Sequence, residues 1–156
     1  MDTNLFGPFV SFPITYISSY QVRGVGAGGV VSTAFCLLYK MFALKITRKQ
    51  VVSIINSRQS VYLRGLGFMY IRYTQPPPDL WAWLEPYLDD EEEIDPRSGG
   101  GDKMTIAQVV KQMLTKLDWY STLFPRIPIP IQKDIDNKIQ ERARLLRGEG
   151  SDDERR

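Results

Sequence analysis

Seven carboxylates lie within eleven consecutive residues and are the side chains best placed to do chemistry. Residues 85–95 have the sequence EPYLDDEEEID, whose densest part is Asp89, Asp90, Glu91, Glu92 and Glu93. A calcium loop of the EF-hand type needs glycine at its sixth position and an acidic residue at its twelfth. Counted from Asp90, those positions hold Asp95 and Gly101, so we predict no metal site. The run is then a solvated loop or a docking patch for basic partners.

Catalysis finds little support in the rest of the composition. The chain has no histidine and one cysteine, Cys36. A chain without histidine lacks Ser-His-Asp triads and histidine-ligated zinc, and one cysteine cannot form an internal disulfide. Cys36 lies in an apolar run, so we expect it to be buried. We predict no catalytic residue and no enzyme.

A glycine-rich segment, Gly24–Gly29, fits the G-x-G-x-x-G spacing of dinucleotide-binding loops. Such a loop should follow a strand and precede a helix, with an acidic residue about 20 positions further on. The first acidic residue after the glycines is Asp79. We therefore predict a flexible loop and no bound cofactor or small-molecule substrate.

Three residues four positions apart, Arg64, Phe68 and Arg72, fall on one face of a predicted helix. Two interpretations are open. The face could clamp an acidic partner segment or an RNA phosphate. Alternatively, the arginines pair within the molecule with the acidic residues Asp89–Glu93. The chain would have to turn at its triple proline and fold back to bring these residues to the helix. We favour the second interpretation.

Four further aromatic residues are candidates for partner binding: Trp81, Trp83, Trp119 and Tyr120. Exposed, they could anchor a protein interface or stack on bases. Buried, they would pack in the core. The chain carries no RNA-recognition signature and a net charge of only +2. Direct RNA binding is therefore the alternative to protein docking.

Apolar residues repeat at intervals of three and four along several segments, as on one face of an α-helix. We predict helices at residues 33–44, 47–55, 61–74, 80–88, 106–117 and 131–147, with a further helical turn over Trp119–Phe124. Two extended pieces, Glu93–Pro96 and Asp102–Thr105, flank a glycine turn and suggest a small β-hairpin near 93–105. The fold class is mainly α, a compact irregular bundle of about seven short helices.

Capping signals mark several helix ends. Thr47 with Gln50 and Thr105 with Gln108 fit the capping box. Ser60 and Asp79 are predicted N-caps, and Gly148 is a predicted C-terminal cap.

The same patterns predict which helices are buried. Helix 33–44 is apolar nearly all round, so we expect it to be central. In the next helix Val51, Val52, Ile54 and Ile55 should point inward. Gly65 and Gly67 each cost about 1 kcal/mol of helix propensity. That cost suggests that another helix crosses closely there.

The 156 residues allow one domain. We predict an N-terminal arm at 1–21, a helical domain at 22–147 and a disordered tail at 148–156. The arm carries Phe6, Phe9, Phe12 and Tyr16 between two prolines, and could be a strap across a hydrophobic surface or a poorly ordered segment. No segment suits a signal peptide or a membrane span, so we expect a soluble intracellular protein without a membrane partner.

Three long segments are specific enough to suggest a family. VSTAFCLLYK, YLRGLGFMYIRYTQPPPDLW and LTKLDWYSTLFPRIPIPIQ, with the DDEE-to-GGG stretch, closely resemble the pre-mRNA-splicing factor 38 family, its B-type members most of all. The resemblance spans about Val22 to Ile139, and residues 1–21 do not resemble the helical segment that family members usually carry.

This resemblance implies a nuclear, non-enzymatic, mostly α-helical scaffold of the spliceosome. It implies association with the tri-snRNP or the precatalytic complex before catalytic activation. The implied partners are other spliceosomal proteins, with RNA contacted indirectly through the complex.

Overall fold

The computed structural model describes residues 33–96, 102–120 and 122–148. The chain divides into two compact units, Met1–Pro125 and Arg126–Arg156, and each is described by itself. The described part contains six α-helices, two short 3-10 helices and two two-stranded antiparallel sheets. The predicted fold class, mainly α with a small hairpin, is confirmed. The predicted boundaries at residues 21 and 147 stay predictions.

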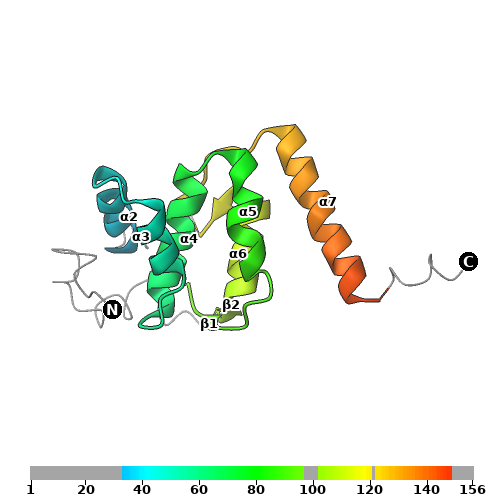
Figure 1. Ribbon diagram of the computed structural model, residues 1–156, viewed down its shortest axis with the longest axis horizontal. Helices are drawn as coiled ribbons and strands as arrows, with labels where there is room; N and C mark the ends of the chain where they lie inside the picture. The colour runs from blue at the N-terminus through cyan, green and yellow to red at the C-terminus, as the bar shows by residue number, and fades with distance from the viewer. Residues whose placement is uncertain (1–32, 97–101, 121, 149–156) are drawn as a thin grey trace, which may run out of the picture. The chain divides into compact units, whose positions relative to one another are not determined.

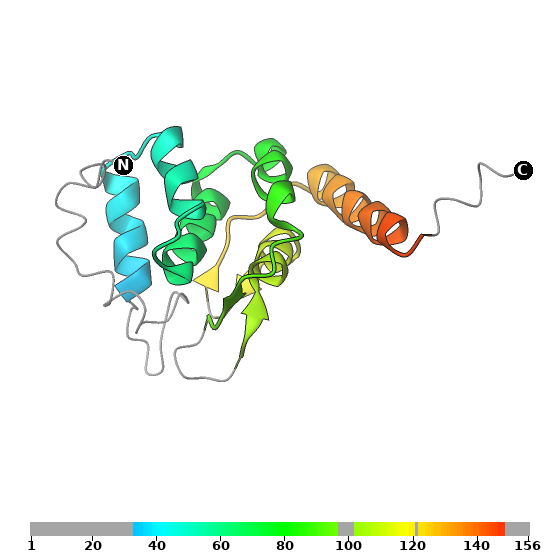
Figure 2. The same ribbon diagram turned by 60° about the horizontal axis from the view of Figure 1, so that its bottom comes forward.

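Helix α4 (Val61–Thr74) is the centre of the first unit. It is buried from Arg64 to Arg72. Four helices contact it: α2 (Thr33–Ala43), α3 (Arg48–Ile55), α5 (Leu80–Leu84) and α6 (Ile106–Thr115). Helices α2 and α3 lie on one side of α4, with α5 and α6 on the other (Figures 1 and 2).

The close crossing predicted from the glycines is present between α3 and α4. A Cβ placed on Gly67 would lie 2.7 Å from the Cγ2 methyl groups of both Ile54 and Ile55. Only glycine leaves room for α3 there. Val51, Ile54 and Ile55 are buried as predicted, whereas Val52, predicted inward, is 39% exposed.

Helix α2 is peripheral, so its predicted central position is wrong. Leu38 and Met41 are buried, but Tyr39 is 72% and Phe42 62% exposed. Cys36, predicted to be buried, is exposed. The prediction rested on α2 being apolar nearly all round. The structure instead buries α4, whose Leu66, Phe68, Met69 and Ile71 lie in the core, and both of its guanidinium groups find partners inside the unit.

The predicted hairpin forms from β1 (Glu93–Ile94) and β2 (Met104–Thr105), with Glu93 opposite Thr105. The helical turn predicted over Trp119–Phe124 is wrong. This segment forms a second hairpin from β3 (Asp118–Trp119) and β4 (Thr122–Leu123). Tyr120 has a positive φ of 48°, which a right-handed helical turn cannot contain.

The helix boundaries follow local signals closely. Both capping boxes are formed, at Thr47 and Thr105. Ser60 and Asp79 occupy the predicted N-cap positions of α4 and α5, but neither side chain makes a capping hydrogen bond. The predicted helix 80–88 consists of α5 and the 3-10 helix η4 (Glu85–Tyr87), which contains Pro86. A second 3-10 helix, η3 (Pro77–Asp79), precedes α5.

The second unit contains helix α7 (Ile129–Leu146). Pro130 stands in its first turn, and Gly148, the predicted C-terminal cap, follows its end with φ 77°. Asp134 and Lys138 form an i, i+4 ion pair at 2.7 Å. Among the described helices, none is both long and apolar enough to cross a membrane.

Candidate functional site

Arg64 joins three segments of the first unit. Its Nε donates a hydrogen bond to the carbonyl of Ile55 at 2.7 Å, at the end of α3. Nη1 bonds Glu92 at 2.7 Å and Nη2 bonds Asp90 at 2.5 Å. The Arg64 side chain is 6% exposed. The predicted internal pairing with the acidic run is therefore present, and it holds that run, which we call the acidic loop (Asp89–Glu93), against α4.

The backbone of the acidic loop also completes the start of α6. The amide of Ile106 donates to the Glu92 carbonyl at 2.8 Å, and that of Ala107 to the Asp90 carbonyl at 3.0 Å. These amides belong to the first turn of a helix, whose donors have no partner within the helix. The Asp90 carboxylate accepts from the Glu92 amide at 3.1 Å. The loop is therefore fixed by backbone and side chain together.

Electrostatics reinforce this arrangement. Burial alone would raise the pKa of Asp90, but hydrogen bonds from Arg64 and the Glu92 amide, with the charge of Arg64, hold it below its ordinary value. Burial works against the charge of Arg64, yet its bonds to Asp90 and Glu92 keep its pKa raised. Both groups are therefore charged in the folded state at neutral pH.

The pairing with the acidic run predicted for Arg72 is wrong, because Arg72 has other partners although it lies on the same face of α4. It is 3% exposed, and its Nε donates to the carbonyl of Met113 at 2.8 Å. Its guanidinium lies 4.9 Å from the centre of the Phe124 ring. Burial lowers its pKa, partly offset by the interaction with Tyr73. Arg72 thus links α4 to α6 and to the segment after β4.

Phe68, between the two arginines, is fully buried and meets the ring of Tyr87 edge-on at 5.0 Å. The face of Arg64, Phe68 and Arg72 therefore lies inside the first unit. The contacts favour the structural interpretation of these three residues over a clamp for a partner.

The four candidate aromatics divide by burial. Trp83 and Trp119 are 7% and 1% exposed, while Trp81 and Tyr120 are half-buried. Trp83 lies under the guanidinium of Arg48 at 4.3 Å. The indole of Trp119 donates to Gln112 at 2.8 Å, and Tyr120 donates to Asp102. These contacts make Trp83 and Trp119 parts of the core, which leaves Trp81 and Tyr120 as the more accessible aromatics.

The acidic loop keeps an exposed side. Asp89, Glu91, Glu92 and Glu93 are exposed, and Asp90 is half-buried. Glu93 pairs with Lys103 at 3.6 Å across the first hairpin, with both side chains mostly in solvent. Within the described ranges, no group of three or more Asp, Glu or Cys side chains is placed to hold a metal ion. The loop therefore offers carboxylates to a partner from a fixed backbone.

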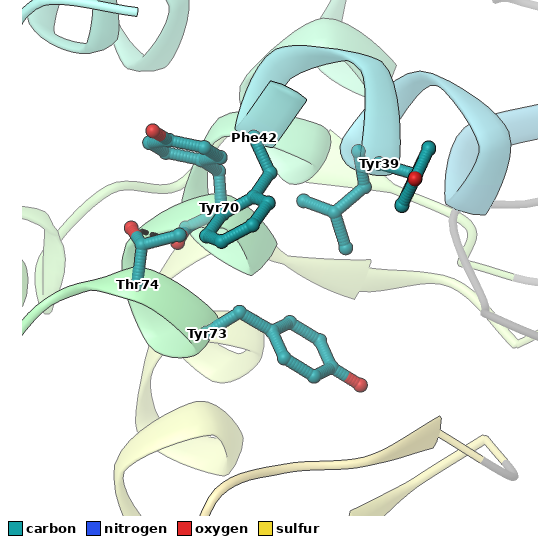
Figure 3. A pocket seen from close by; sticks show the side chains of 6 residues that line it. Tyr39, Phe42, Tyr70, Tyr73 and Thr74 are labelled. Atoms are coloured by element: carbon teal, nitrogen blue, oxygen red, sulfur yellow. Dashed lines mark hydrogen bonds between the residues drawn. The ribbon is translucent and has the colours of Figure 1, made fainter. Parts of the chain in front are cut away.

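An aromatic pocket of about 200 Å³, which no sequence pattern indicated, lies between α2 and α4. Figure 3 shows the rings of Phe42 and Tyr73 near each other, with Tyr39 and Tyr70 around them. Its lining residues are Leu38, Tyr39, Phe42, Tyr70, Tyr73 and Thr74. Apolar residues at helical spacing gave no signal that two helices would leave a gap between them.

Comparisons with known proteins agree with the resemblance. The model of the PRP38 family matches residues 13–137, beginning before the predicted Val22 and including part of the N-terminal arm. Pre-mRNA-splicing factor 38B of Homo sapiens is 61% identical over 131 residues, covering 84% of this chain and 24% of that protein. The Danio rerio protein of the same name is 62% identical over 123 residues, covering 79% and 25%. The chain thus spans about a quarter of these relatives' length.

A solved structure shares the fold. The crystal structure of the Snu23-Prp38-MFAP1(217-258) complex of Chaetomium thermophilum contains a chain that matches with a TM-score of 0.64 at 20% identity. The match covers 86% of this chain and 75% of that one.

Proposed function

The chain belongs to the PRP38 family, and we propose that it is a non-catalytic scaffold of the spliceosome that docks other splicing proteins. We place its action in the nucleus, in the tri-snRNP or the precatalytic complex, before catalytic activation. The splicing-factor names of its relatives support this proposal.

The observation that carries the docking mechanism is the fixed acidic loop. Arg64 holds the carboxylates of Asp90 and Glu92, and the first turn of α6 bonds the loop's backbone, while Glu91 and Glu93 remain exposed. A rigid surface loses little conformational entropy on binding. Carboxylates at its rim attract a basic partner segment and exclude acidic ones.

The partners we propose are splicing proteins that contribute a short segment. The Chaetomium thermophilum complex supports this idea, because one of its components is the segment 217–258 of MFAP1. We infer that a counterpart of MFAP1 or Snu23 docks on this chain. RNA then comes near the chain only through the assembled complex.

The first test is co-purification from nuclear extract with the tagged chain, before and after RNase. Splicing proteins that remain bound after RNase would support a protein scaffold. Loss of all of them after RNase would move the function to direct RNA binding, whose affinity should fall steeply with salt. Recovery of no splicing protein in either arm would refute the proposed function.

A paired substitution tests the exposed side of the acidic loop. Glu91→Lys with Glu93→Lys reverses two exposed charges, while the Arg64 partners Asp90 and Glu92 stay in place. It also removes the Glu93–Lys103 pair, which is solvent-exposed and contributes little to stability. We expect the retained splicing proteins to fall at least tenfold. The matched control is Asp118→Lys with Glu141→Lys, which reverses two exposed charges elsewhere. Equal capture by both variants would remove the loop from the mechanism.

The stage of action needs a separate test. The tagged chain is added to a splicing extract, and complexes arrested before and after catalytic activation are isolated. We expect the chain in the earlier complexes. Its presence only in the later ones would overturn the proposed timing while leaving the scaffold role intact.

A further inference from the structure

The outer face of α2 exposes large apolar side chains next to the aromatic pocket. Tyr39 is 72% and Phe42 62% exposed, and Leu44, directly after the helix, is 54% exposed, whereas Tyr70 on the facing helix is only 6% exposed. Phe42 and Tyr73 both line the pocket (Figure 3). Single exposed apolar residues are ordinary, but a patch joined to an apolar pocket marks a surface that binds something.

We propose that the chain's own N-terminal arm, residues 1–21, docks on this surface, which we call the α2 face. The arm has the matching chemistry. It contains Phe6, Phe9, Phe12 and Tyr16, and its single charged residue is Asp2. An arm with so little charge and so many aromatics has apolar side chains to bury, and removing apolar surface from water favours docking.

The backbone of the arm suits a strap better than a helix. Pro8 and Pro13 lie among the aromatic residues. Each proline removes a backbone donor and disfavours a helical conformation at the residue before it. An extended strap would place its aromatic side chains one after another along the α2 face.

The length of the connection allows this docking. Residues 17–32 separate Tyr16 from Thr33, the first residue of α2. At 1.5 Å per residue, Tyr39 and Phe42 lie about 9 and about 14 Å along the helix from Thr33. A glycine-rich linker of this length has a mean span of about 20–24 Å. The connection includes Gly24–Gly29, which lets the chain reverse direction.

Tethering favours the arm over other occupants. A segment joined to its site through a short flexible linker has an effective concentration in the millimolar range. A second copy of the chain, or a separate protein, would need a comparable concentration or a higher affinity to displace it. We therefore expect the arm to occupy the α2 face in the isolated protein.

The single cysteine provides a direct measurement. Cys36 is exposed on α2, one turn before Tyr39, so a nitroxide attached there lies beside the α2 face. Broadening of the amide NMR signals of residues 1–21 in the full-length labelled chain then reports their approach. We expect strong broadening around Phe6–Tyr16 that is lost in the Phe9→Ser/Phe12→Ser variant. Reduced nitroxide serves as the diamagnetic reference.

A second pair of variants tests the other side of the contact. Tyr39→Ser with Phe42→Ser should also release the arm, because it removes the exposed rings of the α2 face. Leu145→Ser with Leu146→Ser, at two exposed apolar positions of α7, is the control and should leave the broadening unchanged.

Two results would overturn the inference. One is broadening that decreases smoothly with distance in sequence from Cys36 and is the same in every variant, as expected for an undocked arm. The other is broadening that appears when labelled and spin-labelled chains are mixed and that grows with concentration, which would assign the α2 face to a second copy. Neither measurement needs a splicing protein, so a failure here is distinguishable from a failure of the proposed function.

Discussion

Replacing Gly67 with alanine sets two effects of opposite sign against each other. Alanine is favoured over glycine inside a helix by about 1 kcal/mol. The close approach of α3 opposes this gain, because the new Cβ would lie 2.7 Å from the Cγ2 methyl groups of Ile54 and Ile55. The sign of the measured change therefore reports whether the two helices are as close as the structure shows.

The clash should outweigh the gain in helix propensity. Carbon atoms pack best at about 3.5–4.0 Å, so each methyl group must move by about 1 Å. Isoleucine in a helix has one strongly preferred χ1 rotamer, so the methyl groups cannot rotate away easily. Moving α3 instead would stretch the 2.7 Å hydrogen bond from Arg64 to the Ile55 carbonyl. Overpacking of about 3 kcal/mol, less the gain of about 1, leaves the Gly67→Ala variant less stable by about 2 kcal/mol.

Urea unfolding followed by tryptophan fluorescence measures this change, because Trp83 and Trp119 are buried in the same unit. The melting temperature should fall by about 4–8 °C. Ile54→Leu with Ile55→Leu removes both clashing methyl groups, so Gly67→Ala should cost less in that background than in the natural chain. If Gly67→Ala in the natural chain instead raised the free energy of unfolding by about 1 kcal/mol, the gain in helix propensity alone, the close crossing would be refuted.

Three further predictions concern the Arg64 cluster and a turn. In urea unfolding, Arg64→Met should lower the free energy of unfolding by about 3 kcal/mol. This is the low end for breaking a buried ion pair, because Asp90 and Glu92 are partly exposed and can rehydrate. A loss below about 0.5 kcal/mol would contradict the buried pairing. The pKa of Asp90 is lower in the folded state than in the unfolded chain. Its contribution to stability is therefore complete above the unfolded pKa and is lost as pH falls below about 4, so lowering the pH should destabilise the natural chain more steeply than the Arg64→Met variant. Parallel stability–pH profiles for the two proteins would show that Asp90 is not involved. Lys45→Gly should raise the melting temperature, since Lys45 is exposed with φ 50°, a conformation that costs a side-chain-bearing residue about 1 kcal/mol; an unchanged or lower melting temperature would contradict that strain.

The acidic loop shows how far sequence reasoning reaches toward the site. Helical spacing placed Arg64 and Arg72 on one face, and the triple proline returned the chain toward it. This was enough to predict that the acidic run pairs within the molecule. It could not separate the two arginines, because the partner of Arg72 is the Met113 carbonyl, and every residue carries a carbonyl. In the loop, Asp90 and Glu92 bind Arg64, whereas Glu91 and Glu93 are exposed. This division likewise depends on the path of the backbone, which no pattern of side chains encodes.

By itself, the sequence determined the helices and their starts at Thr47 and Thr105, since capping boxes and apolar periodicity act over a few residues. It also determined the family, through long unusual segments. Only the tertiary structure decided which helix lies at the centre. Residues 33–44 are apolar nearly all round, yet α4 is the helix at the centre, and Arg64 and Arg72 on it bond segments distant in sequence. Tyr39 and Phe42 remain exposed, since exposure depends on which surfaces the rest of the chain covers and not on a residue's own polarity.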